Sequence, residues 1–586
     1  MALSTPSESP AVVVKEVDLT GGVPNVQSTT GAIVINSRWG TVEERVKISS
    51  EAELVDVFGS PDSATTFSFH EANMFLKYSN SLQTVRVIDS TAKNAVSTTG
   101  QTASATPPAE VVKNEASFKN QRSALDSDSH TFVAKYPGSL GNSLEVSLCP
   151  YSANDSAFDA WSYKAEFDAA PGTSSFATKN NASNDEVHAV IVDKGGQFTG
   201  TQGTILERYA FTSFGSNAKN DDGTTNYIKD ILNEKSKYVW LVGFDSDFAG
   251  AGAGTALDSG DDFAKTTGTT NTDVDYIFTQ GLNVDSLTTG NMLTGYDLFE
   301  DKDQVEIDFL IAPDFTSRTE QTTVVNDLVT TAGTTRKDCI VVTSPARTDV
   351  VSVNNAATVT TNIVATANTF TKSSYLVMDA NYLKVYDKFN DQFIEIPAAS
   401  STAGIMAATD LNRAPWFSPA GSRRGQYLGI TSTSWSPTKA QRDTLYKAGA
   451  NPIANIPGAG VILFGDKTKL SRPSAFDRIN VRRLFLVLER AISRAAEQVL
   501  FEFNDEFTRA EFVNIVEPVL REVKGRRGIT DFRVVADATN NTAAVIDRNE
   551  FIASIFIKPA RSINYVTLNF VAVRTGVDFE EVVGTV

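Results

Sequence analysis

Histidine is the side chain that most often acts as a general base, and this chain has only three: His70, His130 and His188. A Ser-His-Asp hydrolase needs an imidazole beside its serine, but residues 296–470, which have the pattern of an α/β domain, contain no histidine. The chain also lacks a G-x-S-x-G nucleophile elbow. His70 lies in an amphipathic helical pattern, where a structural role is favoured. These residues argue against a hydrolase.

Metal and phosphate sites are equally poorly supported. Cys149 and Cys339 lie far apart in no motif, and so few cysteines and histidines argue against a zinc site. The run GVILFGDKT, residues 460–468, approaches a phosphate-binding loop, but Asp466 separates the second glycine from Lys467. Its VILF core is typical of a strand, whereas a phosphate cradle needs exposed backbone N–H groups. We expect a strand followed by a turn, and no cofactor.

Two compact basic turns remain, GSRRGQ at 421–426 and KGRRG at 524–528. Each is compatible with a solvated or internally paired turn, or with docking onto an acidic protein surface, because arginine pairs strongly with carboxylates. Neither interleaves with aromatic residues, so single-stranded nucleic acid is the least favoured ligand. Acidic pairs such as Asp301 and Asp303 are typical of surface charge. No catalytic site emerges.

Composition bounds the class of protein. The 586 residues are 41% apolar, enough for a large core, and carry a formal charge of −18. Residues 471–586 contain equal numbers of acidic and basic side chains, so the acidic excess lies upstream, which disfavours nucleic acid as a ligand. The scarce cysteines indicate assembly in a reducing cytoplasm. The first residues lack a signal-peptide pattern, and no run of about 18 apolar residues occurs, so we expect a soluble protein that inserts in no membrane.

Two stretches have α/β texture. Within 30–90, residues 31–40 predict a strand and turn, 50–59 a helix begun by Ser50 or Glu51 and ended by Gly59, and 82–89 a strand. Further on, 305–313 and 338–345 are nearly continuous apolar runs, typical of strands buried on both faces of a parallel sheet. The intervening 317–333 has the length of a crossover helix, and 375–397 predicts a strand and a hairpin.

The intervening sequence differs in composition. Residues 91–130 are rich in Ser, Thr, Ala and Pro, which is typical of a linker. Residues 131–295 contain short β-type runs among Gly, Asn, Asp, Ser and Thr, with 133–150 and 238–244 the clearest strands. We therefore expect a β-rich, surface-exposed module inserted into one α/β domain built from 23–90 and 296–470.

The C-terminal region predicts two helices and a sheet. Residues 480–503 place apolar side chains on one helical face: Val481, Leu484, Phe485, Leu488, Ile492, Ala495, Val499 and Leu500. A second helix, 508–525, is expected to begin with a Thr508–Glu511 capping box, to be kinked by Pro518 and to end at Gly525. Three β-type runs follow: 532–537, 551–559 and 563–573.

Each end of the chain carries an isolated strand-type segment. Near the N-terminus, residues 11–20 predict one short strand followed by a turn-prone GGVPN. At the C-terminus, Gly576 separates Val577, Phe579, Val582 and Val583 from the apolar run before them. Neither segment can build a core of its own, so each needs a partner elsewhere.

Long segments resemble the tail sheath proteins of T-even-type contractile bacteriophages. The similarity is nearly continuous over 460–584, from FGDKT through NDEFTRAEFVNIVEPVLREVKGRRGITDF to IKPARSINYVTLNFVAVRTGVDFEEVVG. Upstream, residues 31–59, KYPGSLGNSLEV at 135–146 and RAPWFSPAGSRRGQ at 413–426 also resemble the family. Residues 90–130 and 151–290 do not.

The resemblance implies a structural subunit rather than an enzyme. Family members stack as six-fold rings around a tail tube, and the sheath contracts to drive the tube through the host envelope. Their α/β core is subtilisin-like without the active residues, which here corresponds to 23–90 plus 296–470, and 471–575 is the C-terminal α+β domain. The implied partners are copies of itself, the tube protein, and baseplate and tail terminator proteins. Assembly in the host cytoplasm and a place in the virion tail follow.

The resemblance also assigns roles to the isolated strands. In contractile sheaths terminal arms add strands to the C-terminal sheet of neighbouring subunits, here 1–22 and 576–586. The N-terminal arm would use Val12, Val13, Val14, Glu16 and Val17, and the C-terminal arm Val577, Phe579, Glu580, Glu581, Val582 and Val583. The receiving sheet would include Ile555, Ile557, Tyr565, Thr567 and Asn569. The turn with Lys524, Arg526 and Arg527 is the expected tube or subunit contact.

Three other functions are alternatives to a tail sheath. A subtilisin-like hydrolase predicts a histidine within 296–470, which is absent. A secreted adhesin or surface-layer protein predicts a signal peptide, and the first residues do not resemble one. The sheath of a phage-derived injection device stays open, because the sequence does not separate it from a virion sheath.

Overall fold

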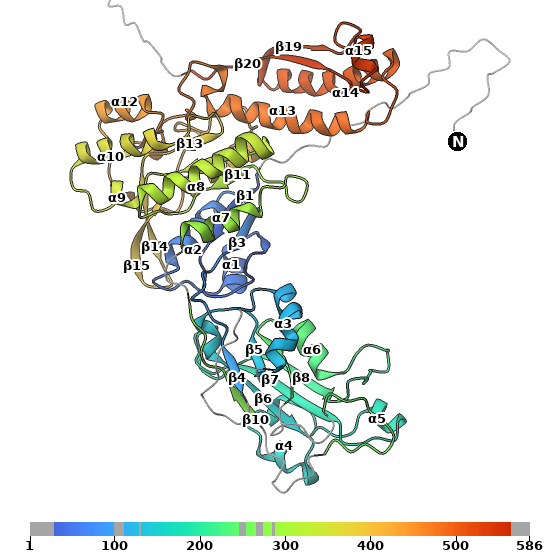
Figure 1. Cartoon of the computed structure of the whole chain (residues 1–586). Helices are drawn as coiled ribbons and strands as arrows, with labels where there is room; N and C mark the ends of the chain where they lie inside the picture. Colours follow the sequence, from blue (N-terminus) through green and yellow to red (C-terminus); the bar gives the residue numbers. More distant parts are fainter. Residues whose placement is uncertain are drawn as a thin grey trace, which may run out of the picture. The chain divides into compact units, whose positions relative to one another are not determined.

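A computed structural model describes residues 29–98, 111–127, 130–244, 253–264, 274–283 and 287–563 (Figure 1). The described chain divides into two compact units. The larger contains residues 29–415 and 419–482, and the smaller contains Trp416–Ser418 together with the chain from Arg483 onward. The expectation of a multidomain protein of mixed α/β type is confirmed.

A six-stranded sheet organises the larger unit, in the order β13-β12-β11-β1-β3-β2. All neighbouring pairs are parallel except β2 with β3. The strands are β1 (Gly31–Ile35), β2 (Arg45–Ile48), β3 (Leu82–Arg86), β11 (Phe309–Ile311), β12 (Ile340–Thr343) and β13 (Leu376–Met378). Every residue of β11 and β12 is buried, as the apolar runs predict. Because β1 pairs with β11, the two α/β stretches of the sequence share one sheet.

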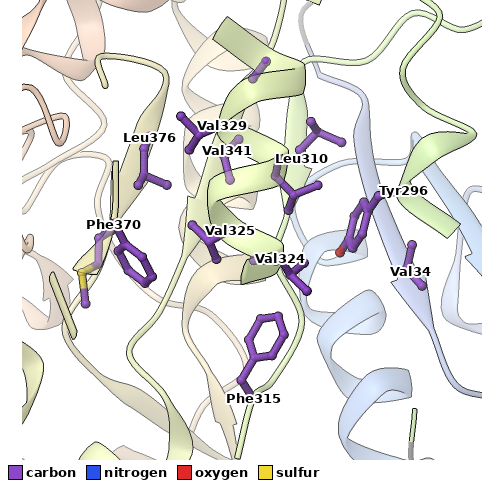
Figure 2. Close-up of a cluster of buried hydrophobic side chains, with 14 of the residues drawn as sticks. Val34, Tyr296, Leu310, Phe315, Val324, Val325, Val329, Val341, Phe370 and Leu376 are labelled. Atoms are coloured by element: carbon purple, nitrogen blue, oxygen red, sulfur yellow. The ribbon is translucent and has the colours of Figure 1, made fainter. Parts of the chain in front are cut away.

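Helices cover both faces of this sheet. On one face α7 (Thr289–Asp297), α8 (Arg318–Thr330) and α10 (Ala356–Thr369) contribute to the main apolar cluster. Figure 2 shows Val324, Val325 and Val329 of α8 beside Leu310, Val341 and Leu376 of the sheet. On the other face α2 (Thr66–Leu76) and α11 (Ala399–Asn412) share a second cluster. Gly31 allows the Phe75 ring of α2 to approach β1, since a Cβ there would lie 2.7 Å from the ring.

The inserted region contains two antiparallel sheets. One has the order β10-β6-β7-β8 and the other β4-β5-β9. Their strands are β4 (Val96–Thr98), β5 (His130–Ala134), β6 (Leu144–Pro150), β7 (Glu186–Asp193), β8 (Thr204–Ser213), β9 (Val239–Leu241) and β10 (Val274–Ile277). The strands predicted at 133–150 and 238–244 are present. Phe132, Val146 and Phe278 belong to one cluster, which gives the insertion a core of its own.

Secondary structure occurs within 91–130, although its composition is typical of a linker. The strand β4 pairs with β5, and α3 (Glu115–Ser127) follows. The Phe118 ring of α3 stacks on Trp240 of β9 with centroids 4.3 Å apart. Leu125 of the same helix is also buried, in a cluster with these two rings. Two apolar anchors among mostly polar residues leave little trace in composition.

Smaller elements complete the larger unit. The hairpin predicted at 375–397 is formed by β14 (Tyr382–Asp387) and β15 (Gln392–Pro397), with β16 (Ser432–Thr433) on the other side of β14. A second hairpin joins β17 (Ile453–Ile456) to β18 (Gly460–Leu463). The helix α1 (Glu51–Phe58) begins after Ser50, whose side chain accepts from Glu53 N, and ends at Gly59 with φ 78°, as predicted.

The smaller unit packs two long helices and a sheet. It contains most of α13 (Ile479–Glu497), then α14 (Glu506–Gly525), β19 (Ile529–Val535), α15 (Ala543–Ile546) and β20 (Ser554–Pro559). Val481, Leu484, Leu488 and Ala495 are buried on the predicted face of α13. The prediction for Leu500 is wrong: α13 ends at Glu497, the helical periodicity stops there, and Leu500 is exposed.

The start of α14 also differs from the expectation. Asp505, not Thr508, is the N-cap, because its carboxylate accepts a hydrogen bond of 2.8 Å from Thr508 N. The helix therefore begins before the expected Thr508–Glu511 box, and its first turn includes Glu506. Pro518 lies inside the helix, and Gly525 is its last residue, as predicted.

Candidate assembly surface

The carboxyl ends of parallel strands are where open α/β folds bind ligands, so that edge is the natural place for an active site. Here it is packed with side chains that bond to one another. Asp379, which follows β13, accepts hydrogen bonds from Ser344 Oγ at 2.8 Å and Thr402 Oγ1 at 3.1 Å. Ser344 Oγ also accepts from Ala399 N at 2.9 Å. All these groups are buried, and burial raises the pKa of Asp379 to about 7. The Ser344 hydroxyl is thus committed to structure.

A second buried cluster lies after β11. Asp314 accepts from Arg347 Nε at 2.6 Å and from the Tyr382 hydroxyl at 2.8 Å. The backbone N–H of Asp314 donates to the Glu71 carboxylate at 3.1 Å. Burial, with repulsion from Asp314, raises the pKa of Glu71 well above its ordinary value. The cluster links α2 to the hairpin and leaves no open nucleophile or base.

His70 is a structural residue, as its helical pattern predicts. Its Nε2 lies 3.2 Å from Asp387 Oδ1, and both side chains are buried. Thr66 donates to the same carboxylate at 2.7 Å. Burial lowers the pKa of His70, which favours the neutral ring. The pair joins α2 to the end of β14.

Residues 460–463 form the strand β18, as predicted, but the expected turn after it is wrong: the turn lies before the strand at 457–459, and 464–466 are irregular. The Lys467 backbone bonds to the Asn451 side chain, with its N–H donating and its C=O accepting at 2.8 Å each. Lys467 Nζ donates to Tyr446 O at 3.0 Å. The Lys467 ammonium and backbone N–H groups, which a phosphate would need as donors, already form hydrogen bonds within the protein.

Cysteine and metal chemistry find no place in the described chain either. Cys149 and Cys339 are buried, and neither forms a disulfide. Across the described ranges no three His, Cys, Asp or Glu side chains gather as a metal-ligating group. None of the helices described is both long and apolar enough to cross a membrane.

The smaller unit instead presents a sheet of two strands. In register, Phe532 lies opposite Ile557 and Val534 opposite Ile555, and this half-buried face packs toward α14. The opposite face carries Asp531, Arg533, Phe556 and Lys558 and is exposed. Among the described residues β19 and β20 pair only with each other. An isolated pair of strands is marginally stable, so this sheet is a natural acceptor for further strands.

The residues predicted for linking fall partly within this sheet. Ile555 and Ile557 lie on β20, on the half-buried face. The remaining receiving residues, Tyr565, Thr567 and Asn569, and both arms, residues 1–22 and 576–586, lie outside the described residues. The exposed aromatic residues around the junction of α13 and α14 are not among those predicted from the sequence. The run LFEFNDEF, which contains three phenylalanines within seven residues, is a signal that could have identified them.

The predicted basic turn follows α14. Lys524 Nζ lies 3.2 Å from Asp531 Oδ1, and Arg526 Nη1 lies 3.3 Å from Glu522 Oε1. Trp416 Nε1 donates to Arg526 O at 3.1 Å and fixes the turn. Arg527, at φ 68°, is exposed and forms no ion pair within the described chain.

Comparison with known proteins decides the family. Residues 285–469 match the phage tail sheath protein central domain, and 471–572 match the phage tail sheath C-terminal domain. The chain is 31% identical to the tail sheath protein of Enterobacteria phage T4, over 98% of this chain and 99% of that one. It is 30% identical to the tail sheath protein of Vibrio phage KVP40 with the same coverage.

The chain belongs to the phage tail sheath family. A sheath tail protein from Listeria innocua has a similar fold, with a TM-score of 0.50 and 12% identity over 91% of this chain and 96% of that one. Members of the sheath family are structural subunits, not enzymes, and the packed carboxyl edge of the parallel sheet agrees with that role.

Proposed function

We propose that this sheath-family chain polymerises as stacked six-subunit rings around a tail tube, and that contraction of the lattice drives the tube through the host cell envelope. The observation that supports this most is that β19 and β20 pair only with each other among the described residues, in a chain with strand-type segments at both ends. The curated relatives that match nearly the whole chain are phage proteins, which favours a virion sheath over an injection device.

The links between subunits are exchanged strands. The arms 1–22 and 576–586 of one subunit add to the sheet of neighbours, beside Ile555 and Ile557 of β20 and Tyr565, Thr567 and Asn569 of the next β-type run. Main-chain hydrogen bonds supply affinity, and alternation of Val577, Phe579 and their neighbours supplies register. A strand with roughly five such bonds gains only a few kcal/mol, at about 1 kcal/mol each. Two arms per subunit make the lattice multivalent, so weak links suffice.

The α/β core is a rigid body that the arms connect. We assign it to the subtilisin-like type, on the basis of its parallel sheet with helices on both faces. Contraction then needs no chemistry: a lattice assembled in a metastable form around tube and baseplate rearranges to bury more surface. Assembly takes place in the host cytoplasm, and the tail terminator caps the finished sheath.

Electron microscopy of the full chain expressed alone, beside a version ending at Thr575, tests this proposal. Long tubes or stacked rings from the full chain and dispersed particles from the truncated one are expected. Tubes from both would remove the C-terminal arm as an essential link. Should the full chain stay dispersed, even when it is co-expressed with the tube protein, the proposed polymerisation would be contradicted.

A further inference from the structure

An aromatic loop joins α13 to α14 in the smaller unit (Figure 1). Three large apolar side chains of this loop, residues 498–505, face solvent: Leu500, Phe501 and Phe503, with 60%, 104% and 84% of their surface exposed. Phe507, in the first turn of α14, is 76% exposed beside them. Three phenylalanines can bury on the order of 500 Å² in a contact. Exposure on this scale in one loop marks a binding surface.

The loop is built to present these rings. Asn504 anchors it, donating from Nδ2 to Glu550 O at 2.7 Å, and Arg509 Nη1 donates to Asn504 Oδ1 at 2.8 Å. Phe501 has φ 69°, a left-handed conformation that costs energy for a bulky residue. The exposed Phe501 ring makes no apolar contact within the described part of the subunit that would offset this backbone strain. A contact between the ring and a partner protein would offset it.

The two ends of α14 carry opposite charge. The aromatic loop and the helix ends beside it, residues 497–508, contain Glu497, Glu502, Asp505 and Glu506 and no basic residue. Glu502 and Glu506 make no ion pair within the described chain. The basic turn at the other end contains Lys524, Arg526 and Arg527. Arg527, which is exposed and unpaired among described residues, has φ 68°, so each end of the helix has one strained, solvent-facing residue.

We propose that the aromatic loop of one subunit docks onto the basic turn of a second copy of this chain. Phe501 and Phe503 pack against the turn and the aliphatic stems of its arginines, and Glu502 pairs with Arg527. Surfaces at opposite ends of one helix make a head-to-tail contact, which propagates into rings or helical lattices. The inference rests on the proposed self-assembly, and of the two partners expected for the basic turn it selects a subunit over the tube.

Single charge reversals and their combination test this contact in the full chain. Glu502→Arg and Arg527→Glu should each reduce the pelleted, tube-forming fraction at least tenfold, because each places like charges in contact. Both changes in one chain should restore assembly, since the pair is then complementary again. Glu511→Arg, an exposed acid in the middle of α14, is the matched control and should assemble as the unchanged chain does. Phe501→Ser should weaken assembly without altering the thermal melt.

Several outcomes would overturn the proposal. Assembly unaffected by either reversal, or not rescued by the combination, excludes the pairing, while a discrete dimer excludes head-to-tail propagation. If the unchanged chain fails to form tubes, the self-assembly proposal fails separately. In that case the contact is tested by cross-linking the double variant Glu502→Cys/Arg527→Cys with a short bis-maleimide at high protein concentration. The native Cys149 and Cys339 are buried and should not react. A ladder of linked chains supports the contact, and its absence contradicts it.

Discussion

The Ser344 hydroxyl donates a hydrogen bond of 2.8 Å to the Asp379 carboxylate, and both side chains are buried at the carboxyl end of the parallel sheet. In an enzyme of this architecture that edge would be open to substrate. Here a serine and an acid are present, but they form hydrogen bonds with each other and with Ala399 and Thr402 of α11. The pair holds the sheet to the helix.

Asp379 gives folding stability a defined pH dependence. Burial raises its pKa to about 7, whereas the carboxyl of the unfolded chain titrates near its ordinary pKa of 3.8. The folded chain therefore keeps a proton that the unfolded chain releases, so this contribution is complete below the unfolded pKa and is lost as pH rises through 7. Asp379→Asn, neutral at every pH, should abolish the loss, which amounts to about 2–3 kcal/mol between pH 5 and 8. Urea unfolding of both chains at the two pH values measures it.

The exposed Asp443→Asn is the control for that experiment. It removes the same charge from α12 (Lys439–Lys447), where the carboxyl is solvated, and should leave the pH profile of the unchanged chain intact. If the unchanged chain and Asp379→Asn lose the same stability between pH 5 and 8, Asp379 does not carry a buried proton in the folded chain.

Arg86 is a buried cation whose hydrogen bonds all go to backbone carbonyls. Its guanidinium donates to Ser37 O at 3.0 Å, Gly40 O at 2.8 Å and Pro137 O at 2.7 Å, which joins β3 to the loop that precedes the insertion's β6. Burial lowers its pKa to about 9. Arg86→Met should cost about 3 kcal/mol, because three buried carbonyls lose a donor at about 1 kcal/mol each. Chemical denaturation measures the change.

An exposed arginine provides the matched variant. Arg208→Met, on β8, removes a contact with Glu166 of 3.4 Å at the surface and should change stability by less than about 1 kcal/mol. Similar costs at the two positions would show that the buried network around Arg86 is not what stabilises the chain.

Gly404 allows α11 and α2 to pack closely. A Cβ at this position would lie 2.4 Å from the Tyr78 ring. Alanine is favoured over glycine inside a helix by about 1 kcal/mol, but overpacking costs about 1–3 kcal/mol. The Tyr78 ring is half-buried, and its hydroxyl is held by a hydrogen bond of 2.6 Å from Leu428 N. Gly404→Ala should therefore lower the melting temperature. Gly525→Ala, at the last residue of α14 with open space around its Cβ, should not, and a fall there but not at 404 would contradict the steric argument.

Local chemistry explains which elements the sequence predicts well. The strands β11 and β12 can be predicted because burial on both faces demands unbroken apolar runs. The bounds of α1 can be predicted because the residues that cap the helix, Ser50 and Gly59, are adjacent to it in sequence. The start of α14 is misplaced because Asp505 and Thr508 are both good caps, and only the hydrogen bond of Asp505 to Thr508 N separates them.

Long-range partners explain what the sequence leaves open. His70 and Asp387, or Arg86 and Pro137, meet only once the chain has folded, and no spacing rule connects them. The helix α3 is not predicted because only Phe118, stacked on Trp240, and Leu125 anchor its mostly polar sequence. The strand-type ends carry a pattern that indicates pairing, but their partner is expected on another subunit, which no single chain contains.

A cryo-electron microscopy map of tubes formed by the full chain tests strand exchange most directly. We predict that residues 577–583 of one subunit lie as a strand in the β19–β20 sheet of a neighbouring subunit, with backbone hydrogen bonds to it. A map in which that segment returns to its own subunit, or in which the sheet gains no strand from a neighbour, would contradict the proposed linkage.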